Sequence, residues 1–127
     1  MNIPAELKYT KNDEWIRDDG TVGVTDYAQD QLSDVVFVEI TVSEGDEIAQ
    51  GDIIGTIESV KAAADVFAPA SGKVVAVNEA LDDRPELINE DPYGEGWLIR
   101  LELANPEELA SLMDAAAYEA YCASREA

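Results

Sequence analysis

The feature that most constrains the fold of this chain is a series of short apolar runs, most of them rich in β-branched residues, separated by turn residues. Five such runs occupy residues 22–24, 35–42, 53–58, 73–77 and 97–103. In the second run every other residue from Val36 to Val42 is apolar, which predicts one buried face and one polar face. Closely spaced short strands with glycine-containing turns are typical of a β-sandwich or barrel, so the sequence predicts a mostly β protein.

Helices are expected at only three places. Thr25 is a suitable N-cap for a short helix through residue 34, and residues 85–89 have room for a single turn. At Asn105 a cap residue, a proline at the first helical position and two acids mark the start of a helix expected over residues 105–121. Its apolar stripe would consist of Leu109, Leu112, Met113 and Ala116. The length suits one domain over residues 1–127, with its core within about 9–104.

The composition excludes several classes of function. Lys and Arg total 8 and Asp and Glu total 28, so the net charge is 8 − 28 = −20, and histidine is absent. Without histidine there is no Ser-His-Asp triad and no His-ligated zinc. A negative field repels phosphate backbones, which argues against nucleic-acid binding, and no apolar run is long enough to span a bilayer. The acidity is explained equally well by docking to basic partner proteins and by solubility in a salty cytoplasm.

The cysteine content and the first residues indicate a cytoplasmic protein. Cys122 is the only cysteine, so no intramolecular disulfide is possible, and no histidine is present to activate it as a nucleophile. The start of the chain, MNIPAELKYT, lacks the basic and apolar regions of a signal peptide.

Gly94-Glu95-Gly96 lacks the third glycine of a dinucleotide-binding fingerprint. The sequence therefore predicts no catalytic centre.

Lys61 lies between two of the β-branched runs. We expect a β-hairpin there, with its tip at Ser59-Val60-Lys61-Ala62. Residues 61–64 are good helix formers, but the β-branched flanks favour the hairpin. A lysine in a turn is usually just a solvated charge. Its functional use would be as a handle for an acyl group, because a hairpin tip is accessible to a modifying enzyme and the long stem gives reach.

Several sequence blocks in a fixed order include and surround Lys61. The central block reads Glu58-Ser59-Val60-Lys61-Ala62 and continues through Asp65, Pro69, Ser71-Gly72-Lys73-Val74-Val75, Val77-Asn78-Glu79 and Leu81. Further blocks occupy residues 12–15, 23–29, 35–39 and 87–98. Together they resemble the glycine cleavage system H protein family, in register from about Tyr9 to Tyr118, and the central block resembles its lipoylation region. Several blocks in register are more specific than one short motif.

The resemblance implies a fold and a cofactor. The fold would be a mostly β barrel-sandwich hybrid of the lipoyl/biotinyl type, with a short helix near the N-terminus and a C-terminal helix. Lys61 would carry lipoate in amide linkage, making this a lipoyl-carrier domain. The turn recognised for attachment would consist of Glu58, Ser59, Val60 and Ala62. Glu14 and Asp65 match acidic positions near the loaded arm in relatives, where a carboxylate would pair with a cationic amine.

The resemblance also implies a function and a set of partners. The chain would shuttle the aminomethyl group of glycine from a pyridoxal-phosphate glycine decarboxylase to a tetrahydrofolate-dependent aminomethyltransferase. Dihydrolipoyl dehydrogenase, an FAD enzyme, would then reoxidise the arm, and a lipoate-attaching enzyme would load Lys61. The chain would be a monomer that catalyses no step and binds no nucleic acid, membrane or metal.

The chain departs from the family pattern at four positions away from the lysine block. Asp13 stands where histidine is usual, Asn12 where serine is common, Ser33 in place of a usual glycine, and Thr41 in place of a frequent proline. These changes concern contacts to the arm more than its attachment.

Other carrier and binding functions are less consistent with the sequence. A biotin carrier would have methionine on both sides of its lysine, where Val60 and Ala62 stand, and a 2-oxoacid dehydrogenase lipoyl domain would belong to a longer chain. Two alternatives to the glycine cleavage role stay open. The chain could donate lipoyl groups to other enzymes, or it could be an unmodified acidic interaction protein.

Overall fold

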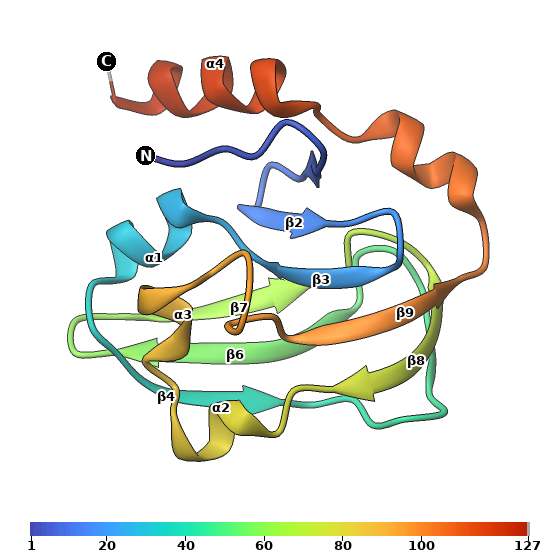
Figure 1. Cartoon of the computed structure of the whole chain (residues 1–127), viewed down its shortest axis with the longest axis horizontal. Coiled ribbons are helices and arrows are strands. Elements are labelled where there is room, and N and C mark those ends of the chain that lie inside the picture. Colours follow the sequence, from blue (N-terminus) through green and yellow to red (C-terminus); the bar gives the residue numbers. More distant parts are fainter. Residues whose placement is uncertain (127) are drawn as a thin grey trace.

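The computed structural model describes residues 1–126, and its strands form two antiparallel sheets (Figure 1). The larger sheet has the strand order β1-β2-β3-β9-β8-β5 and the smaller one has the order β4-β6-β7. The strands are β1 (Lys8–Tyr9), β2 (Glu14–Ile16), β3 (Thr21–Val24), β4 (Val35–Ile40), β5 (Glu47–Ile48), β6 (Ile53–Ser59), β7 (Ala63–Phe67), β8 (Gly72–Val77) and β9 (Ile99–Leu103). The helices are α1 (Asp26–Leu32), α2 (Ala80–Asp83), α3 (Leu87–Glu90), a 3-10 helix (Pro106–Ser111) and α4 (Ala115–Glu126).

The apolar core lies between the two sheets. The smaller sheet contributes Ile54, Ile57 and Val66, and the larger one contributes Ile99 and Leu101, all at most 2% exposed. Full burial of one such side chain is worth about 1.5–3 kcal/mol, so this layer dominates the packing. The predicted mostly β fold with helices near both ends is confirmed. Within residues 1–126 the two sheets form a sandwich and do not close into a barrel.

The prediction that Val36 faces the core is wrong. The register of β4 against β6 shifts between Val35 and Phe37, as in a β-bulge, and Val35 N–H donates to Asn89 Oδ1 at 2.8 Å. The extra residue changes the alternation, so Val35 and Val38 are buried while Val36 and Phe37 are 53% and 51% exposed. Two apolar side chains are thereby placed on the surface of the smaller sheet.

The predicted hairpin at Lys61 is confirmed. Strands β6 and β7 pair antiparallel from Ile53 opposite Phe67 to Glu58 opposite Ala63. The Ser59 N–H donates to the Ala62 carbonyl at 2.8 Å and closes the turn. Ala63 and Ala64 thus lie in a strand and Ala62 in the turn, because the partner strand β6 supplies ladder hydrogen bonds and neighbours that local propensity does not count.

The C-terminal segment is not the single helix expected over residues 105–121. Asn105 Oδ1 accepts a hydrogen bond from Glu107 N–H and starts a 3-10 helix, which ends before the extended residue Leu112. Met113 then pairs with Tyr9 of β1 through two backbone hydrogen bonds of 2.8 and 2.9 Å. Pairing with a strand takes Met113 out of helical geometry, so the helix stops and restarts as α4.

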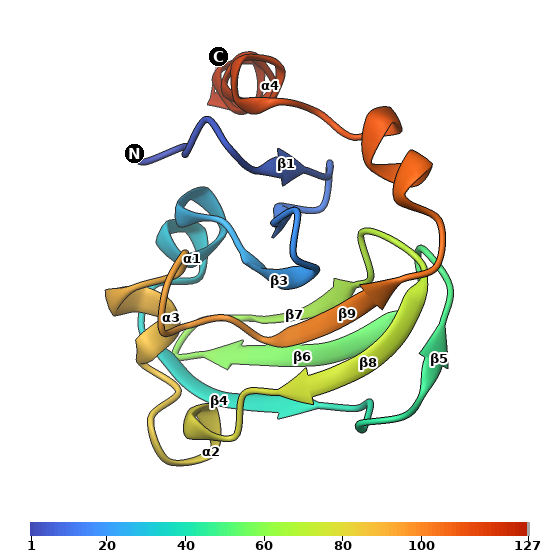
Figure 2. The same cartoon turned by 45° about the vertical axis from the view of Figure 1, so that its right-hand side comes forward.

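Helix α4 covers a second apolar layer on the side of β1 and α1 (Figure 2). The rings of Tyr9 and Tyr118 stack there with their centroids 4.7 Å apart, and burial raises the pKa of both phenols. Trp15 and Cys122 are fully buried in the same cluster. No helix in the described part of the chain has the length and apolar character needed to cross a membrane.

Candidate functional site

Lys61 is exposed in the turn between β6 and β7. This hairpin tip lies at the left end of the smaller sheet in Figure 1. The Ser59 side chain organises this turn: its Oγ donates to the Ala62 carbonyl at 3.1 Å and accepts from the backbone N–H of Lys61 and Ala62 at 3.3 and 3.1 Å. Val60 N–H donates to the Asp34 carbonyl at 3.0 Å, which ties the tip to the start of β4. The lysine therefore projects from a turn whose backbone is held on both sides.

Beside the hairpin lies a cleft of about 170 Å³ between α1 and β7. It is lined by Asn12, Asp13, Val24, Ala28, Gln31, Leu32, Ile57, Ala64, Asp65 and Val66. Most of these side chains are apolar. Because β7 starts two residues after Lys61 and rises roughly 3.3 Å per residue, the cleft begins within about 13 Å of the lysine backbone.

Asp65 lines this cleft at its exposed rim. Its side chain is exposed, and Oδ1 accepts a hydrogen bond from Thr56 Oγ1 at 3.1 Å. Thr56 faces Asp65 directly across the β6–β7 pair. The carboxylate is thus oriented by its neighbour strand and keeps its second oxygen available to a cationic group.

Glu14, the other acid that the resemblance places near the arm, is buried and is not among the residues that line the cleft. It is 1% exposed in β2, with Oε1 accepting from Thr10 Oγ1 at 2.6 Å and Oε2 accepting from Phe67 N–H at 2.9 Å. Burial raises the pKa of this carboxyl, although the two hydrogen bonds oppose the shift. Glu14 therefore joins β2 to the end of β7, next to the cleft residues Asp13 and Val24.

Asp13, one of the four departures from the family pattern, lines the cleft. It adopts a left-handed backbone with φ of 66°, and its carboxylate receives hydrogen bonds from Tyr118 Oη at 2.8 Å and from both terminal nitrogens of Arg125 at 2.6 and 3.1 Å. Arg125 also lies over the rings of Tyr27 and Tyr121, at 4.1 and 4.3 Å from their centroids. Through Tyr118 and Arg125, helix α4 is therefore hydrogen-bonded to the cleft residue Asp13.

No local sequence signal pairs Asp13 with Arg125, because the two are 112 positions apart. The carboxylate makes this pairing possible where the resemblance leads one to expect a histidine. Tyr118 extends the network to Thr25 Oγ1 at 2.7 Å, the residue that caps α1. One hydrogen-bonded chain therefore joins α4, the 12–13 turn and α1 around the cleft.

The arrangement is suited to holding a covalently attached group. An exposed primary amine, a mostly apolar cleft next to it and a carboxylate at the rim match an acyl arm that carries a cationic end. Residues 1–126 contain no cluster of metal-ligating side chains, and the one free thiol, Cys122, is buried. Within the same residues Lys61 is exposed and forms no ion pair.

Comparison with known proteins gives the same family from sequence and from structure. The sequence pattern of the family described as glycine cleavage H-protein matches residues 7–125. The glycine cleavage system H protein of Symbiobacterium thermophilum is 58% identical over 94% of this chain and 95% of its own length. That of Psychrobacter cryohalolentis is 59% identical over 93% of this chain and 96% of its own length.

A solved structure extends this agreement to the fold. The crystal structure of a glycine cleavage system H protein from Mycobacterium marinum covers 98% of this chain and 100% of its own, with a TM-score of 0.83 and 35% identity. The match includes the β6–β7 hairpin and the C-terminal segment, since almost the whole chain is aligned. The chain belongs to the glycine cleavage H-protein family.

Proposed function

We propose that this chain is the lipoyl-bearing carrier of a glycine cleavage system, with lipoate attached to Lys61 through an amide bond. The observation that carries the proposal is the exposed amine of Lys61 on a hydrogen-bonded hairpin tip, next to a mostly apolar cleft, in a member of the H-protein family. When attached, lipoate supplies the dithiolane that takes up an aminomethyl group.

The residues near Lys61 fit such an arm. The apolar lining of the cleft, with Leu32, Ile57 and Val66 among its members, matches a hydrocarbon chain and excludes water from it. Asp65 at the rim is available to accept a charge-assisted hydrogen bond from a cationic amine. Both oxygens of Glu14 already accept hydrogen bonds, so we propose that it acts on the arm by holding the end of β7.

The partners in this proposal are the enzymes of the same system. A pyridoxal-phosphate glycine decarboxylase, a tetrahydrofolate-dependent aminomethyltransferase and an FAD-containing dihydrolipoyl dehydrogenase would each meet the carrier in turn, and a separate enzyme would attach lipoate. The chain itself would catalyse no step and would work in the cytoplasm as a monomer. What its own residues contribute is attachment at Lys61, a rigid turn at Ser59 and a sheltered cleft.

The proposal is tested by loading and turnover of a lysine variant. Lys61→Arg should fold like the wild type, because an exposed like-charged replacement changes the free energy of unfolding by about 0.5 kcal/mol or less. Intact mass after treatment with lipoate, ATP and a lipoate ligase should show one lipoyl-sized increment on the wild type and none on this variant. Glycine turnover with the three partner enzymes should be lost.

Lys73→Arg, at an exposed position in β8, is the matched control and should load and turn over like the wild type. Loading of Lys61→Arg would show that another residue carries the group. A wild type that stays unmodified under these conditions would overturn the carrier function and favour an unmodified interaction protein.

A further inference from the structure

The surface around the hairpin tip combines exposed apolar side chains from two distant parts of the sequence. Val60 is 67% exposed, and the register of the smaller sheet places Phe37 directly opposite Glu58. The backbone hydrogen bond from Val60 to Asp34 brings the start of β4, including Val36, alongside the tip. We define the tip patch as Val36, Phe37 and Val60.

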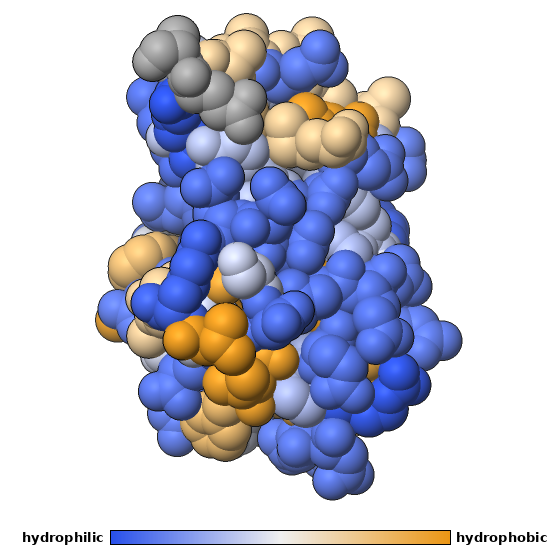
Figure 3. All heavy atoms as spheres, turned by 90° about the vertical axis from the view of Figure 1, so that its left-hand side faces the viewer, coloured by the Kyte–Doolittle hydropathy of each residue, from blue (hydrophilic) through white to orange (hydrophobic). Residues whose placement is uncertain are grey.

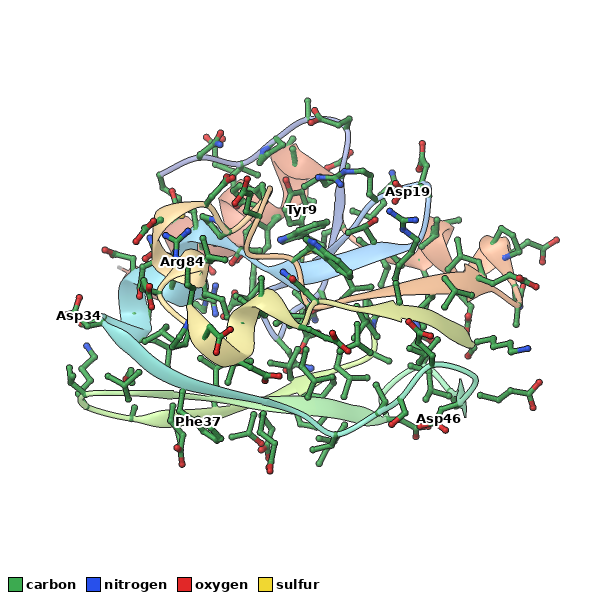
Figure 4. All side chains as sticks on the ribbon, turned by 60° about the horizontal axis from the view of Figure 1, so that its bottom comes forward. Tyr9, Asp19, Asp34, Phe37, Asp46 and Arg84 are labelled. Atoms are coloured by element: carbon green, nitrogen blue, oxygen red, sulfur yellow. The ribbon has the colours of Figure 1, made fainter. Side chains whose placement is uncertain are left out.

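In the described residues, the tip patch is where three exposed large apolar side chains come from two neighbouring segments, the start of β4 and the adjacent turn. The other exposed ones are Met1, Ile53 and Val75, which lie at the N-terminus, at the far end of β6 and on β8. Figure 3 shows an apolar group on the face of the molecule that bears the tip, surrounded by hydrophilic residues. Figure 4 shows Phe37 pointing away from the sheets.

The charge around the patch is one-sided. Residues 34–39 and 58–65, which form the start of β4 and the hairpin tip, contain four acids and a single base, Lys61. Asp34 and Glu58 are exposed at the edge of the patch. A partner surface that covers it must therefore be apolar in the middle and basic at the rim. A second copy of this chain does not meet that requirement, because it would bring the same carboxylates into contact.

We propose that the tip patch is half of the docking surface for the enzyme that acylates Lys61, so that recognition extends from the lysine turn onto the first residues of β4. The inference rests on the proposed function. To form the amide, the neutral Lys61 Nζ attacks the carbonyl carbon of an activated acyl donor on that enzyme. The C–N bond forms, the bond to the leaving group breaks with its electron pair, and the proton of Nζ passes to a base.

The position of the patch distinguishes this enzyme from the other partners. Nζ lies one side-chain length from the turn, so an enzyme that acylates it has to cover the residues around the tip. The enzymes that act on the loaded protein instead meet the far end of the arm, beyond the lysine. Apolar side chains buried in the middle of an interface, with charges at its rim, give affinity and orientation respectively.

The test compares acylation of apo protein by a lipoate ligase with lipoate and ATP, followed by intact mass. The double variant Val36→Ser/Phe37→Ser should lose at least about tenfold in kcat/KM, mainly through KM. The matched control is Ile53→Ser/Val75→Ser, which removes two exposed apolar side chains elsewhere and should stay within about twofold of the wild type. Thermal unfolding of all three proteins checks that they are equally folded.

A second comparison tests the acidic residues at the edge of the tip patch. Asp34→Asn should weaken acylation at low ionic strength and reduce its dependence on salt, since it removes a charge that attracts a basic partner. The inference is overturned if the patch variant is acylated as fast as the wild type, or if the control loses as much. It is also overturned if the patch variant changes the oligomeric state instead. These outcomes differ from a failure of the proposed function, in which the wild type itself would stay unmodified.

Discussion

At the scale of single residues, Glu14 is a carboxylate that folding removes from water. It accepts hydrogen bonds from Thr10 and from the backbone of Phe67, and burial still raises its pKa above the ordinary 4.5. The folded protein therefore binds this proton more tightly than the unfolded chain does. Its contribution to stability is fully present below pH 4.5 and is lost as the pH rises through the higher pKa of the folded state.

We predict that the free energy of unfolding of the wild type, relative to that of Glu14→Gln, falls as the pH rises above 4.5. The glutamine side chain does not ionise, so the difference between the two proteins isolates the titration of residue 14. Urea unfolding between pH 4 and 7 measures it. Glu39→Gln, at an exposed position of β4, is the control. A pH-independent difference for Glu14→Gln would contradict the prediction.

Gly20 and Gly51 allow the cost of a left-handed backbone to be distinguished from the cost of a steric clash. Gly20 and Gly51 have φ of +90° and +92°, but a Cβ on Gly20 would lie 1.9 Å from the Leu101 carbonyl oxygen, whereas one on Gly51 would have no atom within 4 Å. We predict that Gly51→Ala costs about 1–2 kcal/mol for the left-handed backbone alone. Gly20→Ala should cost at least about 2 kcal/mol more, because β9 has to move. Equal losses in urea unfolding would show that the contact at Leu101 relaxes freely.

At the scale of elements, α4 contacts the cleft residue Asp13 chiefly through Arg125 in its last turn. Arg125 donates two hydrogen bonds to Asp13 and stacks on Tyr27, and Tyr118 adds a third bond to the same carboxylate. These contacts hold α4, the 12–13 turn and α1 in one arrangement. The pKa of Arg125 is raised because the folded state stabilises the charged guanidinium.

We predict that Arg125→Met destabilises the protein by about 1–2 kcal/mol, the usual worth of a partly buried charged hydrogen bond. Amide hydrogen exchange should quicken in α4 and in the 12–13 turn before it does in the sheets. Glu119→Gln, at an exposed position of the same helix without a side-chain partner in the described residues, should leave exchange unchanged. Equal exchange in the two variants would show that α4 is held by apolar packing alone.

At the scale of the whole molecule, a net charge of −20 on 127 residues makes the folded state repel itself. The described residues contain three ion pairs, and two of these share Arg84, so few charges are paired. Near the hairpin tip, residues 34–39 and 58–65 carry four acids and one base. The same field that destabilises the compact chain therefore favours encounters with basic surfaces near the hairpin tip.

We predict that the melting temperature rises by about several degrees when NaCl is raised from 0.05 to 0.5 M. Salt screening shortens the range of the repulsion between the acids from above 10 Å to a few ångströms. The rise should level off once that range falls below the spacing of the charges. Scanning calorimetry measures it, and sucrose at matched osmolality is the control for a general solute effect. A melting temperature that is constant or falls with NaCl would show that the acids do not repel each other appreciably.

The sequence by itself determined the features that depend on neighbours in the chain. The β-branched run before Lys61 and the turn residues at the tip favoured a hairpin, and Thr25 specified the start of α1 through its side-chain bond to Ala28. Alternation, turn chemistry and capping act over a few residues, so they can be interpreted without knowing what packs on what. Family resemblance added the proposed role of Lys61, because composition and periodicity alone leave it as a solvated lysine.

Only the tertiary structure decided where long-range contacts override those local rules. Met113 leaves its helix because Tyr9 offers it two backbone hydrogen bonds, and Val36 turns outward because a shifted register places Val35 and Val38 on the core. Asp13 and Arg125 meet across 112 positions. Each of these outcomes depends on a partner from another element, whose identity and distance are set only when the sheets and α4 pack together.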